Sequence, residues 1–316
     1  MESLEAQPRK ICQVTDILNP MKSSLRQFRE LSFTSPYDWG TVLEYFRRHQ
    51  VPHVEAVDRT GYERVVSMRT GLGWFRVEHN SGENKLTLGV WGGTGEDLDE
   101  IAVNVRRMFD LDADPTLLLQ AMNADNFLSQ CWQKNPGLRI ARPWSTLESL
   151  FGAVLGQVVS VRFGRILLSE LIRCAGPATC HPKNSEPIWL FPTTREIAKA
   201  DLSAIRTSEA RKATIRALAQ AIEDHSLDLQ APQDVKALRK SLRNVGGIGA
   251  WTTEYVALRG FADNDAFPAT DYALKQELKR HPNMDIDVVR PCRGYAAVAL
   301  WKSFAEAKRA SDAAVV

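Results

Sequence analysis

One acidic residue, Asp271, lies in a sequence context that suits a catalytic carboxylate. It follows a proline turn and opens a helical pattern, in the run Phe267-Pro268-Ala269-Thr270-Asp271. A carboxylate at the start of a helix usually acts as an N-cap, because it accepts hydrogen bonds from free backbone N–H groups. The same N–H groups favour the charged form of the acid, even in a cleft. A fixed anion of this kind can also stabilise a positive charge that forms beside it.

A short glycine turn precedes Asp271 and joins two apolar, helix-forming runs. It reads Gly246-Gly247-Ile248-Gly249. We expect two helices joined by a hairpin, with Ile248 pointing back into the core. Glycine permits positive φ and close approach of a phosphate, and the N–H groups that begin the second helix favour an anion. A GxG turn alone is more often an ordinary helix corner, but the proline turn and the acid that follow it favour a functional site.

Residues 242–275 together resemble the helix-hairpin-helix, the Gly/Pro-rich loop and the aspartate of base-excision DNA glycosylases, most of all the AlkA type. Three further segments match that family in the same order. They are Tyr37-Asp38-Trp39, Val154-Leu155-Gly156-Gln157-Val158-Val159-Ser160 and Arg293-Gly294-Tyr295-Ala296. The resemblance covers residues 35–305.

The resemblance implies that Asp271 is the catalytic aspartate, since it precedes the Tyr of an Asp-Tyr-x-x-Lys-Gln motif. When an N-glycosidic bond breaks, the sugar C1′ becomes positive. A preorganised carboxylate would stabilise that charge, and could orient or deprotonate the attacking water. Asp263 and Asp265 are rival acids, but they come before the proline turn. The rival functions are a non-catalytic helix-hairpin-helix DNA-binding protein and an all-α interaction module.

Trp251 bears on the reaction type. Relatives that also cut the DNA backbone have a lysine at this place after the GxGx motif, and its amine forms a Schiff base with the sugar. An indole cannot do this. The sequence therefore predicts a monofunctional glycosylase that uses water and leaves an abasic site. A glycosylase for deaminated or oxidised bases is the alternative, and Trp251 disfavours its lyase form.

Aromatic residues near the turn indicate which kind of damaged DNA base the pocket would bind. We expect an electron-rich pocket from Trp251, Tyr255, Tyr272 and Trp301, although each ring alone is more often part of a core. A base alkylated at N3 or N7 of a purine is cationic, so it gains cation–π attraction on such rings and leaves readily. Broad specificity for alkylated bases follows. Gln157 faces the cleft in relatives and is expected to support the pocket without taking part in catalysis.

Duplex DNA containing alkylated bases is the expected partner. The N–H groups of Gly247, Gly249 and Thr252 are the candidate phosphate ligands. A flipped base leaves a gap that a side chain usually fills, and Ile140 matches the family's intercalating position, although an ordinary buried isoleucine is an equal alternative. No cofactor is expected to be required. A structural Na⁺ or K⁺ at the hairpin is implied by the family, held by the backbone carbonyls of Arg243, Val245 and Ile248.

Composition describes an ordinary globular chain of 316 residues with a net charge of +2. Residues 1–100 carry 12 Lys and Arg against 15 Asp and Glu, whereas the remainder carries 28 against 23, so the basic surplus lies with the hairpin. The chain shows no secretion signal and no apolar run long enough for a membrane span. Five scattered cysteines indicate free thiols in a reducing cytosol. We expect a monomer in the bacterial cytoplasm.

The pattern of elements predicts two domains. Residues 39–49 and 96–109 have helical periodicity, Asp38 is a suitable N-cap, and four strands are expected between the helices, at residues 53–57, 62–68, 73–78 and 85–90. This makes residues 35–112 a small α+β domain, which the resemblance likens to the TATA-binding protein. Residues 113–310 form a mostly α domain with the hairpin, residues 1–34 a flexible or loosely docked extension, and residues 311–316 a tail.

Overall fold

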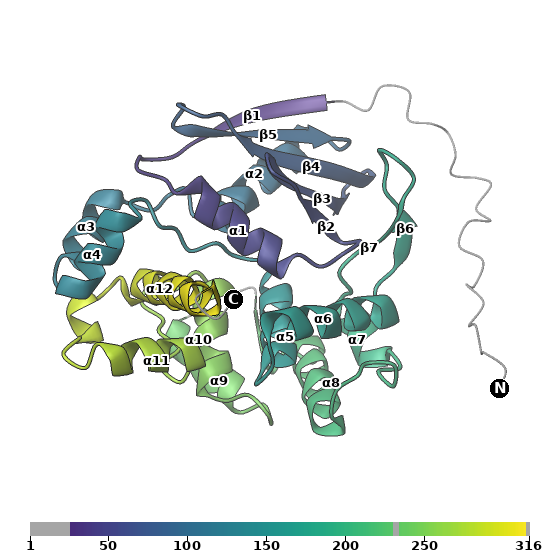
Figure 1. The fold of residues 1–316 in the computed structure, drawn as a ribbon. Coiled ribbons are helices and arrows are strands. Elements are labelled where there is room, and N and C mark those ends of the chain that lie inside the picture. Colours follow the sequence, from purple (N-terminus) through teal and green to yellow (C-terminus); the bar gives the residue numbers. More distant parts are fainter. Residues whose placement is uncertain (1–25, 230–233, 314–316) are drawn as a thin grey trace, which may run out of the picture.

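Two domains lie against each other in the computed structural model, which describes residues 26–229 and 234–313. Figure 1 shows the N-terminal sheet above and the helical domain below, with α1 between them. Among the described residues, no helix is both long and apolar enough to cross a membrane.

The N-terminal domain is an antiparallel five-stranded sheet with two helices, in the strand order β1-β5-β4-β3-β2. Both helices and four of the strands agree with the sequence prediction, and the Asp38 side chain caps α1 by accepting the Thr41 N–H at 2.9 Å. Alternate strand residues such as Tyr62, Phe75 and Leu88 are fully buried against α1 and α2. The elements are β1 (Arg26–Ser32), α1 (Trp39–His49), β2 (Glu55–Val57), β3 (Gly61–Met68), β4 (Gly71–His79), β5 (Lys85–Trp91) and α2 (Gly95–Phe109).

Strand β1 corrects the prediction that residues 1–34 form an extension. Residues 26–32 pair with β5 along their whole length, from Arg26 opposite Trp91 to Ser32 opposite Lys85. Leu31 is the one buried residue of the strand, and Phe28 is 53% exposed. The strand therefore lacks the alternation of apolar and polar residues by which a strand is detected, and backbone pairing at the sheet edge decides it. Residues 1–25 lie outside the described residues.

The second domain is mostly helical, as predicted. Among its described residues, β6 and β7 form a short two-stranded hairpin. Helix α12 continues to Ala313, so residues 311–313 of the predicted tail are helical; residues 314–316 are not described. The elements are α3 (Pro115–Met122), α4 (Asn126–Lys134), α5 (Thr146–Gly156), α6 (Val161–Ala175), β6 (Ala178–Cys180), β7 (Pro187–Trp189), α7 (Thr194–Lys199), α8 (Glu209–Glu223), α9 (Val235–Arg243), α10 (Ala250–Arg259), α11 (Tyr272–Arg280), the 3₁₀ helix η1 (Ile286–Val289) and α12 (Arg293–Ala313).

Polar contacts join the two domains on both sides of α1. On one side, buried Arg64 of β3 pairs with Glu148 of α5. On the other, the Lys302 Nζ of α12 donates to Asp38 Oδ2 at 3.0 Å. Helix α1 also contacts α6, so the N-terminal domain forms one wall of the space between the domains.

Candidate active site at the helix-hairpin-helix

The hairpin between α9 and α10 is a tight turn whose glycines have separate tasks. The Ile248 N–H donates to the Val245 carbonyl at 3.1 Å, and Gly247 has φ 87° at the third position of this four-residue turn. This is the position at which a type II turn needs positive φ. A Cβ on Gly247 would also lie 2.1 Å from Thr214 Oγ1. Ile248 is 6% exposed and packs in the core, as the sequence predicted.

The start of α10 is open to an anion. Its N-cap is Gly249, which brings no side-chain hydrogen bond to the first turn. The N–H groups of that turn are therefore available in the way that phosphate binding requires. Gln157 steadies this end from the neighbouring α5–α6 corner, because its Nε2 donates to the Gly247 carbonyl at 3.1 Å and to Thr252 Oγ1 at 2.8 Å. Thr252 itself is buried.

Asp271 is the N-cap of α11 and also contacts two pocket indoles. Its Oδ1 accepts the N–H groups of Ala273 at 2.9 Å and Leu274 at 3.2 Å, and the Trp301 Nε1–H at 3.0 Å. Its Oδ2 accepts the Trp251 Nε1–H at 2.9 Å. Capping and function are thus compatible here, since four N–H groups complement one carboxylate and fix its direction.

Three of the four predicted pocket aromatics gather around this carboxylate. Trp251 and Tyr255 stack with ring centroids 5.0 Å apart, and Tyr255 meets Trp301 edge-on at 6.3 Å. Tyr272 does not join them. It is 71% exposed and packs edge-on against Phe304 of α12 at 5.9 Å. The structure therefore brings Asp271 together with three rings and leaves Tyr272 outside that cluster.

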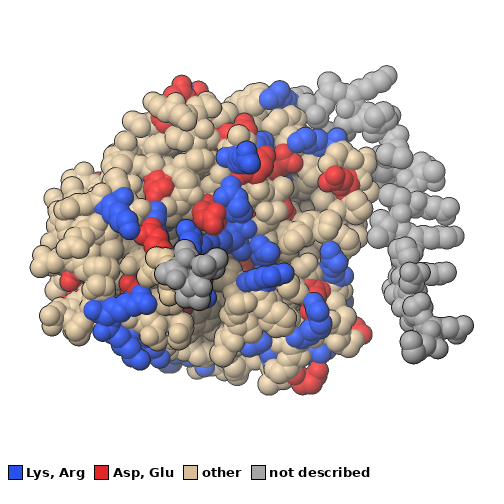
Figure 2. All heavy atoms as spheres, in the orientation of Figure 1, with Lys and Arg blue, Asp and Glu red and all other residues tan. Residues whose placement is uncertain are grey.

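A cavity of about 1850 Å³ opens in front of Asp271, and we call it the interdomain cleft. Its walls come from α1, the α5–α6 corner, the hairpin, the start of α11 and α12. Basic side chains lie along it, and Figure 2 shows Lys and Arg gathered around the middle of this face. The basic residues that line the cleft are Arg48, Arg165, Arg259, Arg280, Lys302, Lys308 and Arg309.

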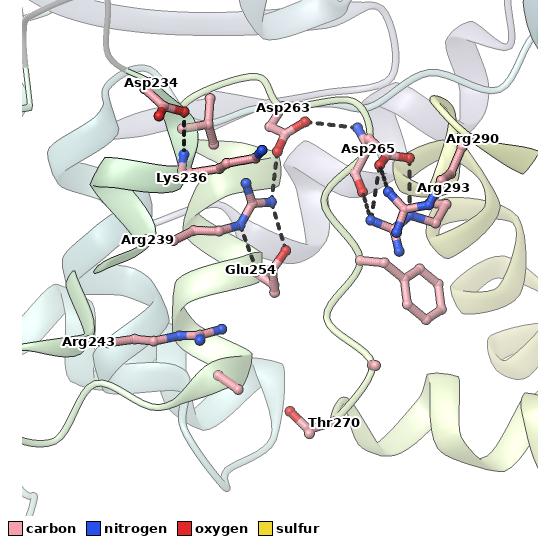
Figure 3. Close-up of a pocket in the computed structure, with 14 residues that line it drawn as sticks. Asp234, Lys236, Arg239, Arg243, Glu254, Asp263, Asp265, Thr270, Arg290 and Arg293 are labelled. Atoms are coloured by element: carbon pink, nitrogen blue, oxygen red, sulfur yellow. Dashed lines mark hydrogen bonds and ion pairs between the residues drawn. The ribbon is translucent and has the colours of Figure 1, made fainter. Parts of the chain in front are cut away.

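The rival acids line a different cavity, of about 640 Å³, beside α9, α10 and the loop before α11 (Figure 3). There Arg239 donates to Glu254 at 2.7 Å and to Asp263 at 2.7 Å. Arg293 donates to Asp265 at 3.0 Å. Both rival carboxylates are therefore held in ion pairs away from the aromatic cluster, and of these three aspartates Asp271 is the one that lines the interdomain cleft.

The prediction that Ile140 is an intercalating residue is wrong. Ile140 is fully buried, and its Cδ1 lies 3.2 Å from the place where a Cβ on Gly294 would stand. Its backbone N–H donates to Asp110 Oδ2 at 2.9 Å. The segment around it runs between the two domains and packs in the core, so the alternative of an ordinary buried isoleucine is correct.

Val158 has the exposure that Ile140 lacks. It stands between α5 and α6, lines the interdomain cleft, is 102% exposed and has φ 57°. Positive φ is uncommon in a β-branched residue, and it often occurs where a side chain is held in a functional position. The sequence contained a signal for it: an apolar residue between the Gly156 that ends one helix and the Ser160 that caps the next.

Among the described residues, no group of three or more His, Cys, Asp or Glu side chains is arranged to hold a metal ion. Cys131, Cys174 and Cys292 are free thiols.

Comparisons with known proteins agree with this geometry. The AlkA N-terminal domain family matches residues 28–145. The chain is 30% identical over 279 residues to the probable bifunctional transcriptional activator/DNA repair enzyme AlkA of Mycobacterium tuberculosis (strain ATCC 25618 / H37Rv), covering 86% of this chain and 56% of that protein. It is 29% identical over 282 residues to DNA-3-methyladenine glycosylase 2 of Escherichia coli (strain K12), covering 86% and 95%. The chain thus spans little more than half of the mycobacterial relative.

Solved structures share the fold. The 3-methyladenine DNA-glycosylase from Archaeoglobus fulgidus superposes with a TM-score of 0.72 at 17% identity, covering 87% of this chain and 98% of that one. The 8-oxoguanine glycosylase/lyase of Clostridium acetobutylicum superposes with a TM-score of 0.64 at 13% identity, covering 87% and 93%. At such identities the likeness establishes the architecture and leaves the substrate open.

A small antiparallel-sheet domain, followed by helices whose hairpin brings one aspartate among aromatic rings, defines the class of helix-hairpin-helix DNA glycosylases. The family match to the N-terminal domain and the relatives along most of the chain narrow this class. The chain is similar to AlkA-type proteins over 86% of its length, and its residues 28–145 match the AlkA N-terminal domain family.

Proposed function

We propose that this chain is a monofunctional DNA glycosylase, which hydrolyses the N-glycosidic bond of alkylated bases in duplex DNA and leaves an abasic site. The observation that carries the proposal is the Asp271 carboxylate, fixed by the indole N–H groups of Trp251 and Trp301 at the wall of the interdomain cleft. Relatives named DNA-3-methyladenine glycosylase support the substrate class.

The geometry supports a short sequence of steps. A nucleotide flipped out of the duplex brings its base against the rings of Trp251, Tyr255 and Trp301, and an alkylated cationic base gains cation–π attraction there. As the bond to the base breaks, C1′ becomes positive, and the fixed Asp271 carboxylate stabilises it without reorganising. Water then adds to C1′, and Asp271 orients it or takes its proton.

Water, not an amine, is the nucleophile in this proposal. Trp251 occupies the position of the lyase lysine and bonds to Asp271 through its N–H. Lys302 does line the cleft, but its Nζ donates to Asp38 Oδ2, so the ammonium is already paired. We expect no covalent adduct when the enzyme is treated with borohydride on abasic or damaged DNA. Strong trapping that disappears in Lys302→Met would refute this part of the proposal.

Three features of the cleft support double-stranded DNA as partner. The uncapped start of α10 provides N–H groups for a phosphate, and basic side chains such as Arg165, Arg280 and Arg309 are among the residues that line the cleft. Val158, in place of Ile140, provides an exposed apolar side chain that would fill the gap left by a flipped base.

A monovalent cation at the hairpin remains part of the proposal. Two neighbouring carbonyls are already bonded by side chains, Gly246 by Thr214 Oγ1 at 3.0 Å and Gly247 by Gln157 Nε2 at 3.1 Å. The carbonyls of Arg243, Val245 and Ile248 are the candidates, and the Val245 oxygen keeps one lone pair beside its bond to the Ile248 N–H. Affinity for abasic DNA should be higher in K⁺ than in tetramethylammonium at equal ionic strength; equal affinities would contradict it.

The decisive experiment is Asp271→Asn, because asparagine keeps the N-cap and removes the charge. We expect the single-turnover release of 3-methyladenine from methylated duplex DNA to fall about 10²–10³-fold, the usual cost of losing one electrostatic stabiliser. Asp114→Asn is the matched control, since Asp114 caps α3 through two N–H groups in the same manner and lies away from the cleft. Release by Asp271→Asn as fast as by the parent protein would refute the role of Asp271, and no release by the parent protein itself would indicate a non-catalytic DNA-binding protein.

A further inference from the structure

An ion pair joins the two domains at the wall of the interdomain cleft. Lys302 lines the cleft from α12, and its Nζ donates to Asp38 Oδ2 at 3.0 Å and to Thr41 Oγ1. The side chains of Lys302 and Asp38 are 22% and 21% exposed. Charges that are mostly removed from water are screened less than surface charges, so each member of this pair affects its surroundings over several ångströms.

Asp38 belongs to the N-terminal domain and is fixed there as the N-cap of α1. Its Oδ1 accepts the Thr41 N–H at 2.9 Å, and its Oδ2 accepts the Thr41 hydroxyl at 2.6 Å. Burial acts to raise the pKa of Asp38, but the hydrogen bonds from Thr41 and Lys302 outweigh burial, so the pKa lies below its ordinary value. Asp38 is therefore a fixed anion at neutral pH, and Lys302 meets it from the other domain.

Trp301 connects this pair to the site of the proposed chemistry. It precedes Lys302 in α12, and its indole N–H donates to Asp271 Oδ1 at 3.0 Å. The Arg259 guanidinium carbon lies 5.3 Å from the centroid of the Trp301 ring. Around Trp301 the cleft thus has two cations, Arg259 and Lys302, and two carboxylates, Asp271 and Asp38.

The balance of these charges matters because the expected substrate is charged. A base alkylated at N3 or N7 of a purine is cationic and gains cation–π attraction on a ring such as that of Trp301. An unpaired ammonium in the same wall would repel this base, and the repulsion is stronger where water is scarce. While Asp38 pairs with Lys302, the two opposite charges cancel and the repulsion is removed.

We propose that Asp38 determines the charge preference of the base pocket, because it neutralises the Lys302 ammonium and so allows a cationic base beside Trp301. This inference rests on the proposed function. It gives the N-terminal domain a part in substrate selection, since Asp38 belongs to that domain, whereas Asp271 and the aromatic cluster belong to the helical domain.

Two duplexes test this charge preference without requiring base release. One carries 2′-fluoro-7-methyl-2′-deoxyguanosine, whose base is cationic and whose fluorine opposes the positive sugar that cleavage needs. The other carries 7-methyl-7-deaza-2′-deoxyguanosine, a neutral base of the same shape. The readout is the Kd for the neutral duplex divided by the Kd for the cationic duplex, measured on one protein preparation so that a loss of folded protein cancels.

Asp38→Asn keeps the N-cap and leaves the Lys302 ammonium unpaired. We expect the ratio of Kd values to fall about fivefold or more, as the cationic base then meets an uncompensated like charge. Lys302→Met should raise the ratio, because it removes the ammonium and leaves the Asp38 anion. The double variant, with both substitutions, should return to the parent ratio. A purely structural ion pair would instead weaken the binding of both duplexes alike in each single variant.

Asp114→Asn is the matched control, since Asp114 caps α3 in the same manner outside the cleft, and its ratio should equal that of the parent protein. A ratio within about twofold of the parent in either single variant overturns the inference, as does a shift of both variants in the same direction. Release of 3-methyladenine by the parent protein is measured separately. Release with constant ratios overturns the inference alone, whereas the expected ratios without release support the inference and overturn the proposed function.

Discussion

The indole N–H of Trp251 donates to the carboxylate of Asp271 at 2.9 Å, although 20 residues separate them in the sequence. Trp251 belongs to the first turn of α10, and Asp271 caps α11. This hydrogen bond couples the element that would hold the DNA strand to the group that would stabilise C1′.

Trp251→Phe tests this coupling, because it keeps an aromatic ring and removes the N–H. A hydrogen bond to a charged group contributes about 1.5–3 kcal/mol, so we expect the rate of 3-methyladenine release to fall at least tenfold. Affinity for abasic DNA should change little, since the hairpin backbone is untouched. Trp189→Phe is the matched control, because Trp189 lies on the β6–β7 hairpin outside the cleft. Unchanged release in Trp251→Phe would show that the indole N–H does not help to fix Asp271.

Substitutions of Val158 and Ile140 should have opposite effects on stability and on base release. Val158→Ala removes an exposed side chain, so the free energy of unfolding should stay within about 0.5 kcal/mol of the parent, while base release from duplex DNA falls. Ile140→Ala leaves a cavity in the core and should lower the free energy of unfolding by about 2–5 kcal/mol, with normal release by the protein that remains folded. Urea denaturation and single-turnover assays measure the two effects, and a reversal of the pattern would restore Ile140 as the wedge.

Gly246→Pro should stabilise the hairpin. Gly246 is the second residue of the turn from Val245 to Ile248. Its φ is not in the left-handed region, and a Cβ at Gly246 would meet no atom within 4 Å. Proline is favoured at this position of a type II turn and restricts the unfolded chain. We expect a gain of about 0.4–1 kcal/mol in the free energy of unfolding and tighter DNA binding. Gly247→Ala is the opposing control and should destabilise, because of its φ and its approach to Thr214.

The burial of His49 predicts that the folded protein loses stability in acid. Burial lowers the pKa of His49 in the folded protein to about 4, below its ordinary 6.5. Between these two pH values the unfolded chain binds a proton at His49 and the folded chain does not. The contribution of His49 to the free energy of unfolding is therefore complete above pH 6.5 and falls as the pH drops towards 4. The full difference amounts to about 3 kcal/mol. Over this range His49→Gln should lose less unfolding free energy than the parent, whereas His225→Gln, in the exposed turn after α8, should follow the parent.

Local pattern was sufficient for most elements of this fold. The helix that Asp38 caps, the strands β2 to β5 and the hairpin of α9 and α10 all carry their signals within a few residues, as periodicity, capping side chains or glycines. β1 was missed because an edge strand with one buried residue has no such signal. The β6–β7 hairpin lacks such a signal for a similar reason, since each of its strands has three residues and Ile188 alone among these six is buried.

The sequence by itself determined the residue types of the site: an aspartate at a helix start, a glycine hairpin, and a tryptophan where an amine would be needed for lyase chemistry. Only the tertiary structure decided which side chains meet. It separated Tyr272 from the other rings, buried Ile140, exposed Val158 and placed Arg259 of one domain on Tyr45 of the other. The physical reason is that spacing along the chain fixes turns and caps, whereas exposure and contact depend on how whole elements pack, and that is decided across the entire core.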